Sequence, residues 1–387
     1  MKQGGKEKGN FPNLRFPGFE GEWEEKKLGE ICKFVRGPFG SALKKEFFID
    51  DGYAVYEQSH AIHNNFHSFR YYISEEKFNS LRRFSVEPKD IIMSCSGTMG
   101  KFAIIPKKSK KGIINQALLK LTPQENFYHK FIKLALELPQ IQNKILSQSA
   151  GGAIKNVVGI PQLKEIELYI PKPIEQNKIS TFFSLLDQRI ETQSKIIEEL
   201  KLLKSTIRNK IFEKIRKSDF KKMEVRDLLE YEQPSKYIVE NVVYSENSAL
   251  IPVLTANKAF ILGYTDEQRG IYDKGDCLIF DDFTMDMKYV DFSFKVKSSA
   301  IKILTPKRGI NLRYMFEYLS FLSLSSKDHK RHYISEVEDM TVPVPLIEEQ
   351  NLIAKLLFAL DHKIKKESSL CVLFCKQKKY LLKEMFI

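Results

Sequence analysis

The sequence predicts an α+β protein with two globular domains, each followed by a long helix, and three observations support this fold class. The chain has 387 residues, which is long for one compact domain of roughly 100 to 200 residues. Hydrophobic residues make up 43% of it, enough for buried cores, and no run reaches the apolar length that crosses a bilayer. An internal repeat, the third observation, then sets the arrangement of the domains.

The repeat is a gap-free match between positions 160–212 and positions 334–386, in which Ile160 aligns with Ile334. Identical residues in this alignment include the pairs Pro171 and Pro345, Gln176 and Gln350, Asp187 and Asp361. The chain therefore contains a duplication.

Each copy of the repeat predicts a long helix. It opens with an extended piece containing proline (LYIPKPIEQN or VPVPLIEEQN) and then runs for roughly ten helical turns without Pro or Gly. Apolar residues recur with a period of 3.5, the pattern of a coiled coil; they are Ile179, Phe183, Leu186, Ile190, Ile197, Leu200, Ile207 and Ile211, then Ile353, Leu357, Leu360, Ile364, Cys371, Phe374, Leu381 and Met385. Polar residues interrupt both seams at equivalent levels, namely Gln193 with Glu367 and Lys204 with Lys378. Because a helix of about 55 Å needs a long partner, we expect residues near 176–215 and 350–387 to pair, in a direction that the pattern leaves open.

The segments before the two helices share one plan. Each mixes short β-like runs, such as 90–94 and 276–280, with turns, and each has a Thr-Pro pair followed by a helix. Placing Pro123 on Pro306 requires a different alignment from that of the helices, so insertions separate the copies. We expect an N-terminal arm (1–23), a first domain (24–172), a first spacer helix (173–217), a second domain (218–346) and a second spacer helix (347–387).

The charge favours an acidic partner. The formal net charge is +13 and the pI is near 9.2, so nucleic acid is the first candidate, although solvated surface lysines would give the same count. The five cysteines are scattered and no apolar signal segment follows the first residues. These features indicate a reducing, cytoplasmic setting without a membrane partner.

Several motifs together resemble a known family. They are Leu14-Arg15-Phe16-Pro17-Gly18-Phe19 with Trp23, Lys27-Leu28-Gly29-Glu30-Ile31, Ser94-Cys95-Ser96-Gly97-Thr98-Met99-Gly100, and the two Pro-x-x-x-Glu-Gln-Asn helix openings. In order and duplication they resemble the specificity subunit of type I restriction-modification enzymes. The second domain departs from the pattern, with Asp281-Asp282-Phe283-Thr284 in place of Ser-Gly-Thr-x-Gly.

That resemblance implies a non-catalytic subunit that binds double-stranded DNA. Each domain would read one half of a split, asymmetric target, and the helices would set the spacing. Two methyltransferase (modification) subunits and translocase-nuclease (restriction) subunits would assemble around the chain and perform methylation and cleavage.

The sequence itself shows no cofactor or metal motif. A DNA methyltransferase needs a cofactor-binding glycine motif and an Asn-Pro-Pro or Asp-Pro-Pro type pocket, and neither is present. Gly97 to Lys101 has the wrong spacing for a phosphate loop, and Phe102 stands where Ser or Thr would bind magnesium. We interpret His60, His63 and His67 as loop histidines, and Cys371 with Cys375 as packing residues.

Two alternatives remain open from the sequence. Asp276 with Asp286 and Lys288, in the acidic cluster around Asp281, could form a metal-dependent nuclease site, which needs two carboxylates on one ion and a lysine near the phosphate. The second alternative is a coiled-coil adaptor whose basic charge serves acidic proteins. Solvated loop charges are the simpler interpretation of the acidic residues.

Candidate DNA contacts are directional donors on polar or glycine-rich loops and lysines suited to phosphates. For base reading we select Arg36, Ser59, His60, Asn64, Asn65, Thr98 and Asn156 in the first domain, and Thr255, Asn257, Arg269, Thr284 and Arg331 in the second. Ser96 is a further candidate DNA contact. For phosphate positioning we select Lys44, Lys45, Lys101, Lys155, Lys258, Lys288 and Lys330.

Overall fold

The structure, a computed structural model, describes residues 9–147, 159–256, 259–324 and 332–387 and divides into two compact units. Unit 1 comprises residues 1–191 and 372–387, and unit 2 comprises residues 192–371. Each unit therefore combines one globular domain with part of each long helix, and the predicted α+β fold class is confirmed.

The globular part of unit 1 contains three sheets. Its elements are β1 (Glu24–Lys27), α1 (Leu28–Ile31), β2 (Cys32–Arg36), β3 (Phe48–Ile49), β4 (Tyr53–Tyr56), α2 (Gln58–His63), β5 (Tyr72–Ile73), α3 (Glu75–Ser80), β6 (Ile91–Ser94), β7 (Phe102–Ile104), β8 (Gly112–Ile114), β9 (Leu118–Pro123), α4 (His129–Leu136), α5 (Pro139–Ser147), α6 (Ile160–Lys164) and β10 (Glu167–Ile170). The strand orders are β2-β9-β6-β7, β3-β5-β4-β8 and β1-β10.

Unit 2 repeats this plan. Its elements are β11 (Lys222–Glu224), α8 (Val225–Leu228), β12 (Leu229–Glu232), β13 (Ile251–Leu254), β14 (Ile261–Thr265), β15 (Cys277–Asp281), β16 (Met287–Val290), β17 (Lys295–Val296), β18 (Ile301–Pro306), α9 (Leu312–Phe321) and β19 (Thr341–Pro343). The orders β12-β18-β15-β16 and β11-β19 correspond to β2-β9-β6-β7 and β1-β10 of unit 1. The third sheet, β14-β13-β17, keeps one parallel strand pair, as β4-β8 does.

The two long helices are α7 (Pro173–Arg216) and α10 (Ile347–Glu384). Proline is well suited to the first helical position of α7, because the missing N–H has no partner inside a helix there. Gln176 donates to the carbonyls of Pro171 and Asn126 and accepts from the N–H of Tyr128. The equivalent Gln350 makes the same three bonds, to Pro345, Gly309 and Asn311. These bonds fix each helix to the loop that precedes α4 or α9, and they align the two domains in the register that places Pro123 on Pro306.

The helices run antiparallel within each unit, which settles the direction that the sequence left open. In unit 2, Gln193 bonds to Glu367 at 2.5 Å and Lys204 to Asp361 at 2.7 Å, so numbers rise along α7 as they fall along α10. In unit 1, Lys378 pairs with Asp187. The polar residues that interrupt the predicted seams are therefore paired residues of the coiled coil.

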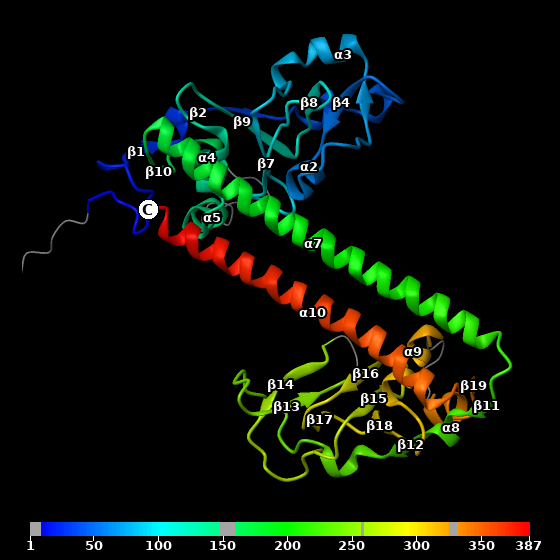
Figure 1. Ribbon diagram of the computed structural model, residues 1–387. Helices are drawn as coiled ribbons and strands as arrows, with labels where there is room; N and C mark the ends of the chain where they lie inside the picture. The colour runs from blue at the N-terminus through cyan, green and yellow to red at the C-terminus, as the bar shows by residue number, and fades with distance from the viewer. Residues whose placement is uncertain (1–8, 148–158, 257–258, 325–331) are drawn as a thin grey trace, which may run out of the picture. The chain divides into compact units, whose positions relative to one another are not determined.

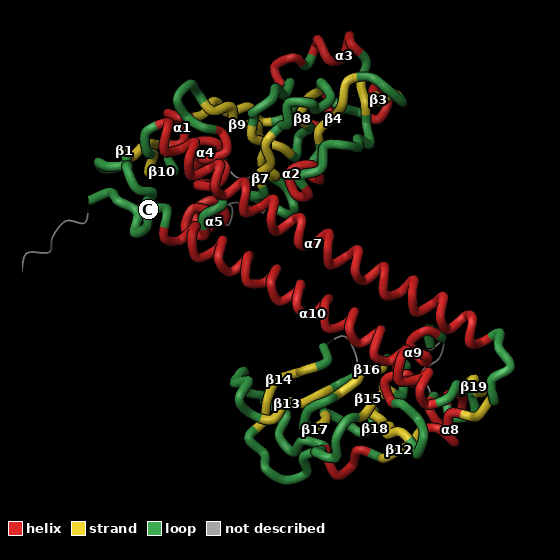
Figure 2. Tube along the Cα trace, viewed as in Figure 1, coloured by secondary structure: helices red, strands yellow, loops and turns green. Residues whose placement is uncertain are grey.

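Each globular core receives the end of a long helix. In unit 1, Phe386 near the end of α10 stacks on Phe131 at 5.2 Å and meets Trp23 edge-on, and Figure 1 shows this red end of α10 beside α5. In unit 2, the equivalent Phe212 of α7 is fully buried against Tyr314 and Tyr318 of α9. Figure 2 shows that α9 also lies beside α10. No described helix is long and apolar enough to span a membrane.

Candidate nucleic-acid interface

A glycine-rich loop joins β6 to β7 in unit 1 and carries Ser96, Thr98 and Lys101. The amide of Gly100 donates to the carbonyl of Ser94 at 2.9 Å, and the amide of Lys101 donates to the Ser94 hydroxyl at 3.0 Å. Gly97 and Gly100 have φ values of 60° and 71°, a left-handed conformation that favours glycine. The loop is closed at its base, and Thr98 and Lys101 are exposed.

Arg36 lies beside this loop because β2, β6 and β9 end together. The amide of Gly37 donates to Leu118 O and that of Cys95 to Ala117 O, so the residues after β2 and β6 meet the start of β9. One guanidinium nitrogen of Arg36, Nη1, is buried with no hydrogen-bond partner in the described parts of the chain. Forked donors of this kind recognise guanine edges.

Helix α2, which carries the candidate Ser59, places the neighbouring Gln58 beside the same loop, and the sequence analysis did not select Gln58. A Cβ placed on Gly97 would lie 3.5 Å from Gln58 Nε2. Gln58 is an amide donor and acceptor, the type of side chain that recognises adenine. Its position directly before Ser59 was the signal available in the sequence.

The structure corrects the role expected for His60. Its side chain is 4% exposed, lies against Phe69 at 4.8 Å, and accepts a hydrogen bond from the Glu57 amide at Nδ1. His60 is a core residue that caps the start of α2, and it cannot reach a DNA base. Asn64 and Asn65 end the same helix at its other side, exposed, with Asn64 in the left-handed conformation.

Unit 2 has a counterpart of the glycine loop between β15 and β16. The amide of Met285 donates to the carbonyl of Asp281, and the Asp281 carboxylate accepts from the amides of Phe283 and Thr284 at 3.0 and 2.9 Å. Met285 has a φ of 59°, like Gly100. A carboxylate thus organises this turn where glycines organise the first one, and Thr284 is exposed.

A buried ion pair supports this second loop. Lys302 Nζ lies 3.3 Å from the Asp282 carboxylate, with both side chains 2% exposed, and it donates to the Tyr231 hydroxyl at 3.0 Å. Asp282 also accepts from the amide of Tyr333. The pair holds the residue next to Asp281 in a fixed position.

The remaining candidates are scattered. Thr255 is 7% exposed, which corrects its assignment as a base contact because the surrounding residues cover it. Arg269 is exposed, and Lys288 lies in β16 opposite Ile279. Lys44 and Lys45 are exposed near a short 3₁₀ turn. Lys155, Asn156, Asn257, Lys258, Lys330 and Arg331 lie outside the described residues.

The nuclease alternative is wrong on geometry. Asp276 precedes β15 and Asp286 precedes β16, and these strands are antiparallel with Cys277 opposite Val290 and Phe280 opposite Met287. Asp286 falls opposite Asp281, so the two carboxylates lie at opposite ends of the hairpin, roughly 16 Å apart along the strands at 3.3 Å per residue, too far to share an ion. Asp276 accepts a hydrogen bond from the Tyr289 hydroxyl at 2.5 Å. No group of three His, Cys, Asp or Glu side chains that could hold a metal occurs in the described ranges.

Two of the cysteines, Cys95 and Cys277, are buried in the cores of the two domains. Burial raises the pKa of the Cys95 thiol to about 11 and that of Cys277 to about 12, so both remain protonated and weakly nucleophilic at neutral pH. All five cysteines of the chain are free.

Comparisons with known proteins agree with this duplicated architecture. The model of the type I restriction modification DNA specificity domain matches residues 20–202 and again residues 217–370. The chain is 45% identical over 125 residues to the EcoR124I/EcoR124II specificity subunit of Escherichia coli, a match that spans 31% of each chain. It is 23% identical over 390 residues to the putative MjaX specificity subunit of Methanocaldococcus jannaschii, covering 91% of this chain and 90% of the relative.

Solved structures show the same fold. The S subunit of a type I restriction-modification system from M. genitalium superposes with a TM-score of 0.67 and 17% identity over 97% of this chain and 99% of that one. A chain from a study of complex assembly and conformational transition of the type I R-M system gives 0.56 and 14%, covering 96% and 98%. The adaptor alternative has no support among these comparisons.

Proposed function

Since this chain belongs to the type I restriction-modification DNA specificity family, we propose that it is the non-catalytic, DNA-reading subunit of such a system. The observation that carries the proposal is the double match to the specificity domain, one match on each globular domain. The two domains share strand order but carry different loops between β6 and β7 and between β15 and β16. One scaffold with two different loops is suited to reading a bipartite, asymmetric target.

The proposed reading edge of the first domain is the set Arg36, Gln58, Ser59, Ser96 and Thr98, with Lys101 on a phosphate. Its support is their convergence at one end of the sheet and the unpartnered Arg36 nitrogen. In the second domain, the turn with Thr284 takes the equivalent place. Arg269, Lys288, Lys44, Lys45, Asn64 and Asn65 are candidates for outer contacts, where a net charge of +13 favours a polyanion.

The relatives are specificity subunits of restriction enzymes, so the proposal includes partners. Two methyltransferase subunits and the translocase-nuclease subunits would assemble with the chain and perform the chemistry. We also propose a cytoplasmic location, which the five free cysteines support.

The test is to express the full chain with the modification subunits of its own system and to sequence the methylated sites. We expect a split target. Thr98→Ala should relax one half of it and Thr284→Ala the other. Lys101→Ala serves as control and should weaken methylation at every site, with a smaller salt dependence of binding. A continuous target, or one half changed by both threonine variants, would contradict the division between domains.

A further inference from the structure

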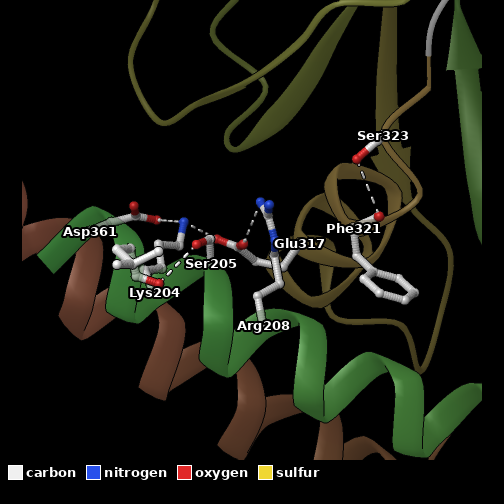
Figure 3. Close-up of polar contacts among 8 residues, drawn as sticks. Lys204, Ser205, Arg208, Glu317, Phe321, Ser323 and Asp361 are labelled. Atoms are coloured by element: carbon white, nitrogen blue, oxygen red, sulfur yellow. Dashed lines mark hydrogen bonds and ion pairs between the residues drawn. The ribbon is translucent and has the colours of Figure 1, made fainter. Parts of the chain in front are cut away.

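Helix α9 of unit 2 carries a buried carboxylate that faces the long helices. Glu317 is fully buried, and its Oε1 accepts from Lys204 Nζ of α7 at 2.7 Å. Arg208 Nη1, one turn further along α7, lies 4.0 Å from the other oxygen of Glu317. Lys204 also reaches Asp361 of α10 at 2.7 Å, and Figure 3 shows these four side chains in one polar cluster. Burial raises the pKa of Glu317, while both cations oppose that rise.

The equivalent cluster of unit 1 has lost half of its charges. In the alignment of the two domains, which the matching bonds of the two buried glutamines establish, Glu317 corresponds to Leu134. In the alignment of the two long helices, Arg208 corresponds to Leu382. Leu134 is 6% exposed in the core of unit 1, and Leu382 packs against the same core.

The other half of the cluster is present in both units. Lys204 and Asp361 correspond to Lys378 and Asp187, which form an ion pair in unit 1. Because this ion pair is the same in both units, it does not favour docking of one helix end over the other. Within this cluster, the pair Glu317–Arg208 of unit 2 is replaced by Leu134–Leu382 in unit 1.

The end of α7 packs on the second domain and the end of α10 on the first, and these two docking sites therefore favour different helix ends. If the end of α7 docked on a first domain, the guanidinium of Arg208 would face Leu134 without a carboxylate. If the end of α10 docked on a second domain, Leu382 would replace the second cation of Glu317. Buried charges without partners are costly.

The competing arrangement requires a second copy of this chain. Helix α10 has 38 residues, about 57 Å at 1.5 Å per residue, so its far end cannot return to the domain from which it starts. Two chains could pair α7 with α7 and α10 with α10, because the duplicated seams are alike. Each such dimer would contain both mismatches twice.

We propose that Glu317 with Arg208, set against Leu134 with Leu382, is a pairing code that directs the end of α7 to second domains and the end of α10 to first domains. The code favours closure of the chain on itself over pairing of like halves from two chains. It concerns assembly and does not depend on DNA reading.

The experiment co-expresses two full-length copies of the chain with different affinity tags and measures how much of one tag follows the other. Arg208→Leu with Glu317→Leu makes both sites apolar, and Leu134→Glu with Leu382→Arg makes both sites polar. Either double variant removes the difference between the sites. The matched control combines all four substitutions, which restores a difference with reversed placement. Two chains can also associate by pairing α7 of one with α10 of the other, which involves no mismatch. This association contributes the same background of co-purified tag in every sample.

We expect each double variant to raise the co-purified fraction roughly tenfold, which corresponds to about 1.4 kcal/mol and is no more than the cost of a buried charged group that lacks its partner. The fourfold variant should return to the wild-type level. Co-purification at the wild-type level in the Arg208→Leu, Glu317→Leu variant would overturn the proposal even if the polar variant failed to fold. A fourfold variant that associates as strongly as the double variants would overturn it too.

Discussion

The residues beneath the β6–β7 loop of unit 1 and the β15–β16 loop of unit 2 share one backbone arrangement but differ in chemistry. They are apolar in unit 1 and ionic in unit 2, the same difference that separates Leu134 from Glu317. The amide of Cys95 donates to Ala117 O, and the amide of Asp282 donates to the equivalent Ala300 O. Opposite them, Leu119 and Phe34 of unit 1 correspond to Lys302 and Tyr231 of unit 2.

The difference shows that these replacements occur as sets. Asp282, Lys302 and Tyr231 satisfy one another by hydrogen bonds and an ion pair, whereas Cys95 and Leu119 are fully buried among apolar neighbours. A single exchange between the sets would remove one of the groups that pair with a buried charge. The comparison can therefore be broken by single substitutions and repaired by matched ones.

The largest effect is expected from Lys302→Leu, which imports the residue of unit 1 alone. It removes the Lys302 ammonium from the buried ion pair with Asp282, and breaking a buried pair costs about 3–5 kcal/mol. Adding Asp282→Asn should recover part of the loss, because the amide oxygen can still accept from the Tyr333 amide. Hydrogen exchange across residues 277–306 reports the change locally. Equal protection in the single variant and wild type would contradict the structural role of the pair.

A second, smaller effect tests whether the duplicated features are equivalent. Gln176→Ala and Gln350→Ala each remove a buried amide that makes three bonds. Each substitution should destabilise its own unit by about 1–3 kcal/mol, the cost of unsatisfied buried polar groups. Denaturant unfolding gives the size, and exchange near Tyr128 or Asn311 gives the place. Strongly unequal losses would mean that the two helix openings are not equivalent.

A third test concerns a contact that the described residues make in unit 1 and not at the equivalent position of unit 2. Arg15 of the N-terminal arm forms two 2.7 Å bonds with Glu175, which is 1% exposed, while the equivalent Glu349 is exposed. Arg15→Ala should cost about 1–2 kcal/mol, since Glu175 loses its charged partner. Glu349→Gln, the matched control, should change stability by less than about 0.5 kcal/mol. The midpoint of urea unfolding distinguishes the two, and equal shifts would refute the asymmetry.

The last effect, on the pH dependence of stability, is expected from His129→Leu, which gives this position the residue of the equivalent Leu312 in unit 2. Burial, with Lys89 and Lys130 nearby, lowers the pKa of His129 to about 4. A depressed pKa contributes stability above the unfolded value of 6.5, and this stability is lost as pH falls towards 4. The variant should unfold with a weaker pH dependence between these values. Wild-type slope in that window would show that His129 does not titrate as described.

The sequence by itself determined the duplication, the two long helices and the α+β class, because each depends on periodicity and on residues repeated at a constant offset. Gln176 and Gln350 were visible as identical positions, and the glycines around Thr98 already indicated a tight turn. The family resemblance followed from the order of such local motifs, which can be read along the chain without knowing how it folds.

The tertiary structure decided what depends on distant residues meeting. Direction of the helix pair was open, because an apolar seam attracts a partner of either orientation; ion pairs such as Lys204 with Asp361 show that it is antiparallel. His60 looked like a loop donor until Phe69 and the Glu57 amide were seen to enclose it. The nuclease site failed because antiparallel pairing separates residues that sequence spacing leaves near each other. The sequence did not single out Glu317, because a carboxylate on a predicted helix is usually exposed. Its burial depends on packing of α9 against the long helices.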